Sequence, residues 1–238
     1  MDAVGVQSRG PGSQVEPRSE GLVPSDSERA RSSMDSKRDE TQQVERFGAL
    51  FCGGASRRMG RDKALLEWRG QPLLMHGVEV LRASCASVFL APGPEARYAE
   101  FGLPSALDRQ PGLGPLAGLE AALSRAVEQA ADPTRALLCV LACDMPHASA
   151  LVFDALFAGL GEADACLLRG PSGQEPLFAV YRLGVLAHVR AALDQGARRM
   201  DSFHPAIKLA YVDAESLPPA AYASNWNTLE DYREGERS

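Results

Sequence analysis

The chain has 238 residues, a formal net charge of −6 and a hydrophobic content of 45%. This length fits one large folded domain or two small ones with an ample core. The sequence contains no apolar run near the roughly 18 residues needed to span a bilayer. The acidic balance excludes nucleic-acid binding by bulk positive charge. We therefore expect no membrane association and no nucleic-acid partner.

Residues 1–46 differ in composition from the rest of the chain. They hold no aromatic residue, eight Ser and 16 charged residues. Such a segment cannot bury enough apolar surface to offset its ordering entropy. It lacks the apolar stretch of a secretory signal, and it is too rich in Asp and Glu for a transit peptide. We predict a disordered N-terminal extension over 1–46 and one folded domain over 47–238.

Short apolar runs alternate with amphipathic stretches along the folded part. This alternation is typical of an α/β fold with three α/β/α layers, in which helices cover both faces of a mainly parallel sheet. Ligands of such sheets bind beyond the carboxyl ends of the strands. The patterns predict strands at 47–51, 87–91, 105–107, 136–144, 163–168, 176–181 and 207–212, and helices at 72–84, 95–101, 115–131, 149–160, 184–195 and 228–233.

The five cysteines are odd in number and form no C-x-x-C motif. Neither a disulfide framework nor a zinc site is indicated. Reduced thiols in a cytoplasmic protein are the simplest interpretation. Cys139 and Cys143 share one face of a predicted strand, where small core residues are expected.

A glycine-rich loop follows the first predicted strand, in the stretch LFCGGASRRMGRDK over residues 50–63. Gly53 and Gly54 allow a sharp turn and a close backbone approach to a ligand. Unpaired amides in such a turn bind phosphate oxygens. Lys63 is one of three lysines among 25 basic residues, and a lysine is a compact charge suited to one phosphate oxygen. A solvated lysine is the alternative.

An aspartate follows the most apolar predicted strand. Asp144 stands in VLACDMP, and a carboxylate after a buried strand is costly unless something uses it. It is placed to hold Mg²⁺, which takes carboxylate and phosphate oxygens. The alternative is an N-cap for the helix that follows Pro146.

A second loop rich in Gly and Pro spans residues 108–118 as DRQPGLGPLAG. Gly112 and Gly114 allow close backbone contact, and the Asp108 carboxylate matches the N1–H and N2–H₂ donors of guanine. The alternative is a turn that merely enters the next helix. Phosphates at the first loop, a metal at Asp144 and a base at Asp108 converge on one nucleotide–Mg²⁺ complex. No Ser-His-Asp or Cys-His pattern supports a covalent acyl mechanism.

These motifs together resemble the molybdenum cofactor guanylyltransferases of the MobA-like NTP transferase family. The family's opening pattern, L-A-G-G-x-x-x-R-M-G-x-x-K, is similar to LFCGGASRRMGRDK, and GPLAG and CDMP match its next two motifs. EPLFAVY, GARRMDSF and NWNTLED resemble its later ones. The resemblance covers essentially all of 47–238 and leaves out the 46-residue extension.

The resemblance implies a Rossmann-like domain that transfers GMP from GTP to the phosphate of molybdopterin and releases pyrophosphate. It places Gly53, Gly54 and Lys63 at the triphosphate, next to Cys52, with Arg58 in the same loop as a further candidate for phosphate contact and catalysis. It also implies nucleotide contact for Asp108, Mg²⁺ binding for Asp144 and molybdopterin contacts for Asn225 and Asn227. Arg198 and Arg199 lie in a segment suited to steering an anionic pterin phosphate.

The chain departs from the family pattern at three positions. Cys52 replaces a small Ala, Ala91 stands where an Asn often contacts the nucleotide, and Glu175 replaces a His before P-x-x-A. Two alternative enzymes are a CTP-dependent molybdopterin cytidylyltransferase and a sugar-phosphate nucleotidyltransferase. A non-catalytic GTP-binding partner in cofactor delivery is another alternative. Transient contact with molybdenum-insertion proteins or molybdoenzyme chaperones is the expected protein partnership.

Overall fold

The computed structural model describes residues 44–53 and 62–218. Seven strands form one sheet, in the order β5-β4-β1-β6-β8-β7-β9, and two short strands pair in a separate hairpin. The strands of the large sheet are β1 (Arg46–Phe51), β4 (Ser87–Gly93), β5 (Ser105–Leu107), β6 (Leu137–Ala142), β7 (Ala165–Gly170), β8 (Gly173–Arg182) and β9 (Leu209–Asp213), and the hairpin is β2 (Glu67–Trp68) with β3 (Gln71–Pro72).

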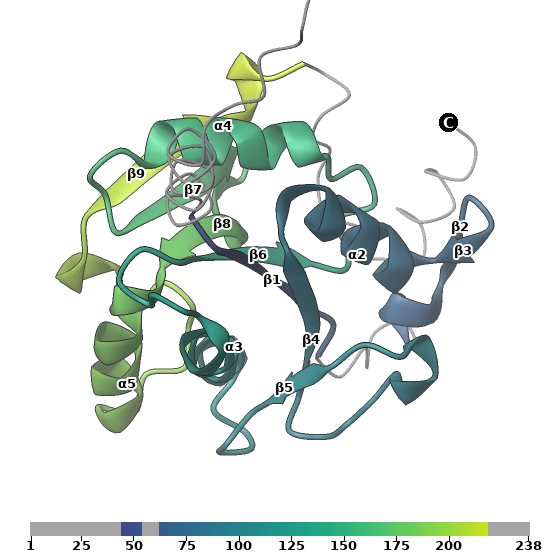
Figure 1. The fold of residues 1–238 in the computed structure, drawn as a ribbon, viewed down its shortest axis with the longest axis horizontal. Helices are drawn as coiled ribbons and strands as arrows, with labels where there is room; N and C mark the ends of the chain where they lie inside the picture. Colours follow the sequence, from purple (N-terminus) through teal and green to yellow (C-terminus); the bar gives the residue numbers. More distant parts are fainter. Residues whose placement is uncertain (1–43, 54–61, 219–238) are drawn as a thin grey trace, which may run out of the picture. The chain divides into compact units, whose positions relative to one another are not determined.

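Four α-helices cover the sheet in two pairs. They are α2 (Leu73–Ser84), α3 (Pro115–Gln129), α4 (Ala150–Leu160) and α5 (Leu186–Asp194). Figure 1 shows α3 and α5 on one face of the sheet and α2 and α4 on the other. The predicted three-layer α/β architecture is therefore confirmed. Short 3₁₀ turns connect the remaining segments: η1 (Lys63–Leu65), η2 (Ala99–Phe101), η3 (Leu183–Val185), η4 (His204–Ala206) and η5 (Ala214–Ser216).

The central strand β1 supplies both layers of the core. Phe47, Ala49 and Phe51 pack into the cluster beneath α3 and α5, whereas Leu50 packs into the cluster beneath α2 and α4. This division follows from the alternation of side chains along a strand. The neighbouring strand β6 is buried along its whole length, as expected for a strand covered on both faces.

The sheet is mainly parallel, as predicted, except at β8. This strand runs antiparallel to both β6 and β7. The connection from β7 to β8 is a tight turn through Pro171 and Ser172, with Gly173 at a φ of 114°. A connection this short joins only antiparallel strands, because a parallel crossover needs a dozen residues or more.

Most predicted boundaries differ from the structure by one to three residues, and three differences have a clear local cause or consequence. Arg46, assigned to the N-terminal extension, is the first residue of β1 and pairs with Leu137. The predicted helix over 95–101 is reduced to η2, because Tyr98 has a φ of 66° in the left-handed region, which a regular helix cannot include. The predicted strand over 136–144 ends at Ala142. The predicted helix over 228–233 lies outside the described residues.

Helix α2 packs on the sheet through a close contact at Gly48. A Cβ added at Gly48 would lie 3.1 Å from the Cβ of Leu81 and 3.2 Å from Val88 Cγ2. Leu81 is fully buried at this contact. The absent side chain of Gly48 thus lets Leu81 fill the space over the centre of the sheet.

We expect Leu81→Ala to lower the free energy of unfolding by about 2–5 kcal/mol, because it leaves a cavity that close-packed neighbours fill only in part. Urea denaturation followed by circular dichroism measures the loss. The matched control is Arg82→Ala, one residue along α2 and exposed, which should change stability by less than about 0.5 kcal/mol. Equal effects of the two substitutions would contradict this packing.

Candidate functional site

A cavity of about 470 Å³ lies at the edge of the sheet where β1, β4 and β6 end. This is the edge at which parallel α/β sheets bind ligands. The lining comes from these strand ends, the segment that begins at Asp62, the loop before α3 together with the first turn of α3, and one residue of β8. It consists of Phe51, Cys52, Gly53, Asp62, Lys63, Ala64, Ala91, Gly93, Pro94, Asp108, Gly112, Gly114, Pro115, Gly118, Ala142, Cys143, Asp144 and Leu177.

Lys63 and Asp144 form an ion pair inside this cavity. Lys63 Nζ lies 3.5 Å from Asp144 Oδ2, and the two side chains are 20% and 24% exposed. Burial raises the pKa of Asp144, and the neighbouring Lys63 charge opposes this rise. The pair brings together two residues that are 81 positions apart in the sequence. The structure therefore places a cation and a carboxylate side by side at the ends of β1 and β6.

Asp144 does not cap the helix that follows it. Helix α4 begins at Ala150, and the Ser149 side chain caps it by accepting a hydrogen bond of 3.2 Å from the Leu151 amide. The alternative interpretation of Asp144 as an N-cap is thus wrong. Its carboxylate faces the cavity, where its described partner is Lys63.

Asp62 organises the segment that carries Lys63, and the sequence interpretation did not single it out. Its Oδ1 accepts a hydrogen bond of 3.2 Å from the Ala64 amide and so caps η1. Its Oδ2 accepts a 2.8 Å bond from the Tyr98 hydroxyl and pairs with Arg97. Tyr98 also donates to the Cys52 carbonyl at 3.2 Å. The available signal was an Asp directly before a short turn, a common N-cap pattern.

Gly53 comes into contact with the end of β4. A Cβ at this position would lie 2.8 Å from the carbonyl carbon and oxygen of Pro92, closer than non-bonded atoms approach. The amides of Cys52 and Gly53 both donate to the Ala91 carbonyl, each at 3.2 Å. The Gly53 amide is therefore paired within the protein, whereas the sequence predicted unpaired amides in this turn that bind phosphate. Gly53 instead allows the chain to turn tightly over β4.

The cavity cysteines are protonated thiols. Burial raises the pKa of Cys52 to about 12 and raises the pKa of Cys143 well above its ordinary value. A thiol is a poor nucleophile until it is deprotonated. Cys139 is fully buried beside them in the sheet, as predicted for a small core residue. The five cysteines are all free.

Asp108 presents a carboxylate oxygen without a partner among the described residues. Its Oδ1 is buried and makes no hydrogen bond there, while its amide donates to the Gly93 carbonyl at 3.1 Å. Burial, and next the charge of Glu120, raise the pKa of Asp108. A buried acceptor without a partner is costly and calls for an explanation. A ligand with hydrogen-bond donors, bound in the cavity, would satisfy it.

The loop after Asp108 leads into α3 through two glycines. Gly112 and Gly114 have φ of 83° and 74°, a region that favours glycine. A Cβ at Gly114 would lie 3.0 Å from the Arg198 carbonyl oxygen, which accepts from the Leu116 amide at 3.4 Å. The segment around Arg198 thus lies against the beginning of α3. Arg199 is exposed and binds Asp201 through two hydrogen bonds of 2.8 and 3.0 Å.

Of the remaining predicted positions, Glu175 lies apart from these contacts, Ala91 lies at the cavity, and the others lie outside the described residues. Glu175 is half-buried on β8 and pairs in register with Leu168. Ala91 lines the cavity with a methyl group and holds the loop through its backbone carbonyl. Four predicted site residues lie outside the described residues: Gly54, Arg58, Asn225 and Asn227.

Asp144 suits a divalent cation that also binds a phosphate-bearing ligand. Mg²⁺ in proteins is often held by one or two carboxylates together with substrate phosphates. Within 44–53 and 62–218, no group of three or more His, Cys, Asp or Glu side chains forms a dedicated metal cage. No helix in those ranges is long and apolar enough to cross a membrane.

Comparison with known proteins places this geometry in a family. A family model described as MobA-like NTP transferase domain matches residues 48–207. A protein from Opitutus terrae named probable molybdenum cofactor guanylyltransferase is 37% identical over 194 residues, covering 80% of this chain and 94% of that protein. A protein of the same name from Carboxydothermus hydrogenoformans is 31% identical over 188 residues, covering 77% of this chain and 91% of its own.

A solved structure shares the fold. The molybdopterin-guanine dinucleotide biosynthesis protein A of Archaeoglobus fulgidus superposes with a TM-score of 0.64 at 23% identity, covering 80% of this chain and 97% of that chain. The chain therefore belongs to the MobA-like NTP transferase family of nucleotidyltransferases, as the sequence motifs predicted.

Proposed function

We propose that this protein transfers GMP from GTP to the phosphate of molybdopterin and releases pyrophosphate, which gives the guanine dinucleotide form of the molybdenum cofactor. The observation that carries the proposal is one cavity with two different polar ends, one beyond β6 and one beyond β5. The Lys63–Asp144 pair lines the cavity after β6, and the unpartnered Asp108 carboxylate lines it after β5, with β4 and β1 between these two strands in the sheet. Similar proteins named molybdenum cofactor guanylyltransferase support the choice of substrates.

The two ends of the cavity match the two ends of GTP. Lys63 offers a compact cation for the triphosphate, which an ammonium binds as a point charge. The Asp108 carboxylate accepts hydrogen bonds, and guanine offers N1–H and N2–H₂ on one edge. An adenine presents an acceptor at N1, and a cytosine presents an acceptor at N3. The chemistry of Asp108 therefore favours GTP over ATP and CTP.

The transfer needs no nucleophile from the protein. An oxygen of the molybdopterin phosphate attacks the α-phosphorus of GTP, and the bond from this phosphorus to the bridging oxygen breaks. Pyrophosphate leaves with that electron pair. Positioning and charge neutralisation supply most of the catalysis in such transfers. Protonated thiols at Cys52 and Cys143 fit a direct displacement.

Lys63 and Asp144 have different electrostatic roles in the proposed transfer. Lys63 neutralises charge on the triphosphate and on the departing pyrophosphate. Asp144 holds Mg²⁺, which supplies Lewis-acid polarisation of the phosphate oxygens when bound. Asp62 keeps the Lys63 segment in place through its bonds to Ala64 and Tyr98. These roles assign each charged group of the cavity to positioning or to charge neutralisation.

Four further residues complete the proposed site from the parts of the chain outside the described residues. Gly54 and Arg58 bind phosphate in the first loop, and Asn225 and Asn227 bind the molybdopterin side. Arg198, exposed beside the entrance to α3, steers the anionic pterin phosphate. We propose a cytoplasmic location and transient contact with molybdenum-insertion proteins or molybdoenzyme chaperones, since the product must reach its enzymes.

The direct test incubates the protein with Mg²⁺, molybdopterin and each of GTP, CTP and ATP in turn, and measures pyrophosphate. We expect release with GTP that depends on molybdopterin, because the Asp108 carboxylate selects the guanine edge. Omission of molybdopterin is the control for simple hydrolysis. Faster release with CTP would assign the protein to cytidylyl transfer instead. GTP binding without any pyrophosphate release would indicate a non-catalytic partner.

We expect Asp144→Asn to lower kcat for GTP-dependent transfer by about a hundredfold or more, since the metal loses its carboxylate ligand. The amide has nearly the same shape, so the melting temperature should stay close to that of the parent protein. Pyrophosphate release at several Mg²⁺ concentrations measures the effect. Undiminished Mg²⁺-dependent turnover in this variant would remove Asp144 from the metal site.

We expect Gly53→Ala to impair GTP binding strongly, because its methyl group would lie 2.8 Å from backbone atoms of Pro92 and force the loop away from β4. The matched control is Gly184→Ala, where an added Cβ meets no atom within 4 Å. Equilibrium binding of GTP with Mg²⁺ compares the two variants. Unchanged affinity in Gly53→Ala would show that the tight turn is not needed for the nucleotide.

A further inference from the structure

A network of charged side chains lies behind the proposed base-binding end of the cavity. Glu120, in the second turn of α3, has a side chain only 8% exposed. Arg190 on α5 donates from Nε to Glu120 Oε1 at 2.9 Å and from Nη2 to Ser124 Oγ at 3.0 Å. Ser124 in turn donates to Glu120 Oε1 at 2.9 Å. A buried carboxylate needs such partners to offset its desolvation.

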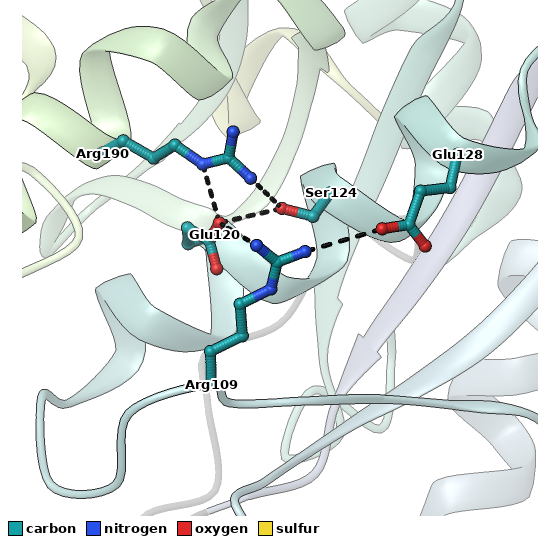
Figure 2. Close-up of polar contacts among 5 residues, drawn as sticks. All are labelled: Arg109, Glu120, Ser124, Glu128 and Arg190. Carbon is teal, nitrogen blue, oxygen red and sulfur yellow. Dashed lines mark hydrogen bonds and ion pairs between the residues drawn. The ribbon is translucent and has the colours of Figure 1, made fainter.

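A second arginine joins this network from the loop that carries Asp108. Arg109 Nη1 lies 3.8 Å from Glu120 Oε1, and its Nη2 lies 3.5 Å from Glu128 Oε1. Figure 2 shows Arg109 and Arg190 converging on Glu120 from two different segments. The Arg109 side chain therefore attaches the residue after Asp108 to two points along α3.

Asp108 and Arg109 line different cavities. Asp108 lines the 470 Å³ cavity of the proposed nucleotide site. Arg109 lines a separate cavity of about 240 Å³ together with Glu120 and Arg190. The arginine is thus placed to hold the loop from behind rather than to contact the nucleotide. Gly112 and Gly114 both have positive φ, and glycine restricts the backbone less than any other residue. A side-chain contact from Arg109 therefore adds a restraint that the loop backbone does not supply.

We propose that Glu120, held by Arg190, is the anchor of a positioning network that acts through Arg109 to fix the Asp108 carboxylate for selection of the nucleobase. The inference rests on the proposed function, because it assumes that Asp108 contacts the base. Glu120 and Arg109 are positioning residues and touch no substrate. Their loss lets the loop move, so that Asp108 meets the guanine edge with poorer geometry while the phosphate end is unchanged.

The test measures equilibrium binding of GTP and of ATP with Mg²⁺, together with KM and kcat for transfer. The variants are Arg109→Gln, Glu120→Gln and the double variant. We expect each single change to lower the preference for GTP over ATP by about tenfold, to raise KM for GTP and to leave kcat within about twofold. The double variant should lose no more than either single variant, because both changes break one connection.

Two controls separate positioning from general damage. Arg82→Gln removes an exposed charge from α2, on the opposite face of the sheet from α3 and α5, and should leave the GTP preference unchanged. Arg109→Lys keeps the positive charge and should restore part of the preference. The Arg109 side chain is 57% exposed, so its replacement should leave the packing of the core intact. Arg109→Gln therefore tests the positioning role even where Glu120→Gln folds poorly.

The outcomes distinguish the inference from the proposed function. An unchanged GTP preference in Arg109→Gln, or strictly additive losses in the double variant, would overturn the inference while transfer by the parent protein stands. A parent protein that prefers GTP but releases no pyrophosphate would overturn the proposed transfer, and the binding preference would still decide the inference. A parent protein with no preference for GTP would overturn both.

Discussion

The proposed site depends on one half-buried carboxylate just beyond the end of a wholly apolar strand. All six residues of β6 are buried, and Asp144 follows two positions after the strand ends. The cost of burying this charge falls when a cation lies beside it. Lys63 supplies that cation at 3.5 Å. The Lys63–Asp144 ion pair therefore holds the segment that begins at Asp62 against the end of β6. This segment forms part of the cavity lining.

The main parts of this arrangement were predictable because they depend on local sequence. Apolar runs that end in Asp or Gly predicted strands followed by ligand-binding residues. The carboxyl ends of parallel strands lie at one edge of the sheet, so these residues were expected to lie close together. Lys63, Asp108 and Asp144 were singled out in this way, and all three line one cavity. Arg97, Tyr98 and the antiparallel β8 were not. The Asp62 contacts join residues 35 and 36 positions apart, and no local pattern signals partners at that separation.

The Glu120 network was also invisible in the sequence for a physical reason. A helix interior with one Glu among Ala and Leu predicts an exposed carboxylate, since charged groups are seldom buried. Glu120 is buried because α5 brings Arg190 to it and the preceding loop brings Arg109. The sequence of α3 alone indicates neither of these two arginine contacts. Periodicity reports which face of a helix is apolar, but it does not report which polar residues find partners across the layers.

The two ends of the cavity differ in how their charges are satisfied. Lys63 and Asp144 satisfy each other within the protein, so phosphate and metal binding must exchange one set of charge contacts for another. Asp108 Oδ1 has no such partner among the described residues. A ligand that donates to it gains a hydrogen bond at a group already desolvated by folding, whereas a ligand that presents an acceptor leaves it unsatisfied. Sites of this kind discriminate strongly between analogues. Selectivity between nucleotides should therefore come mainly from the contact between Asp108 and the base. The rigidity of the loop that carries Asp108 should determine how strong this selectivity can be.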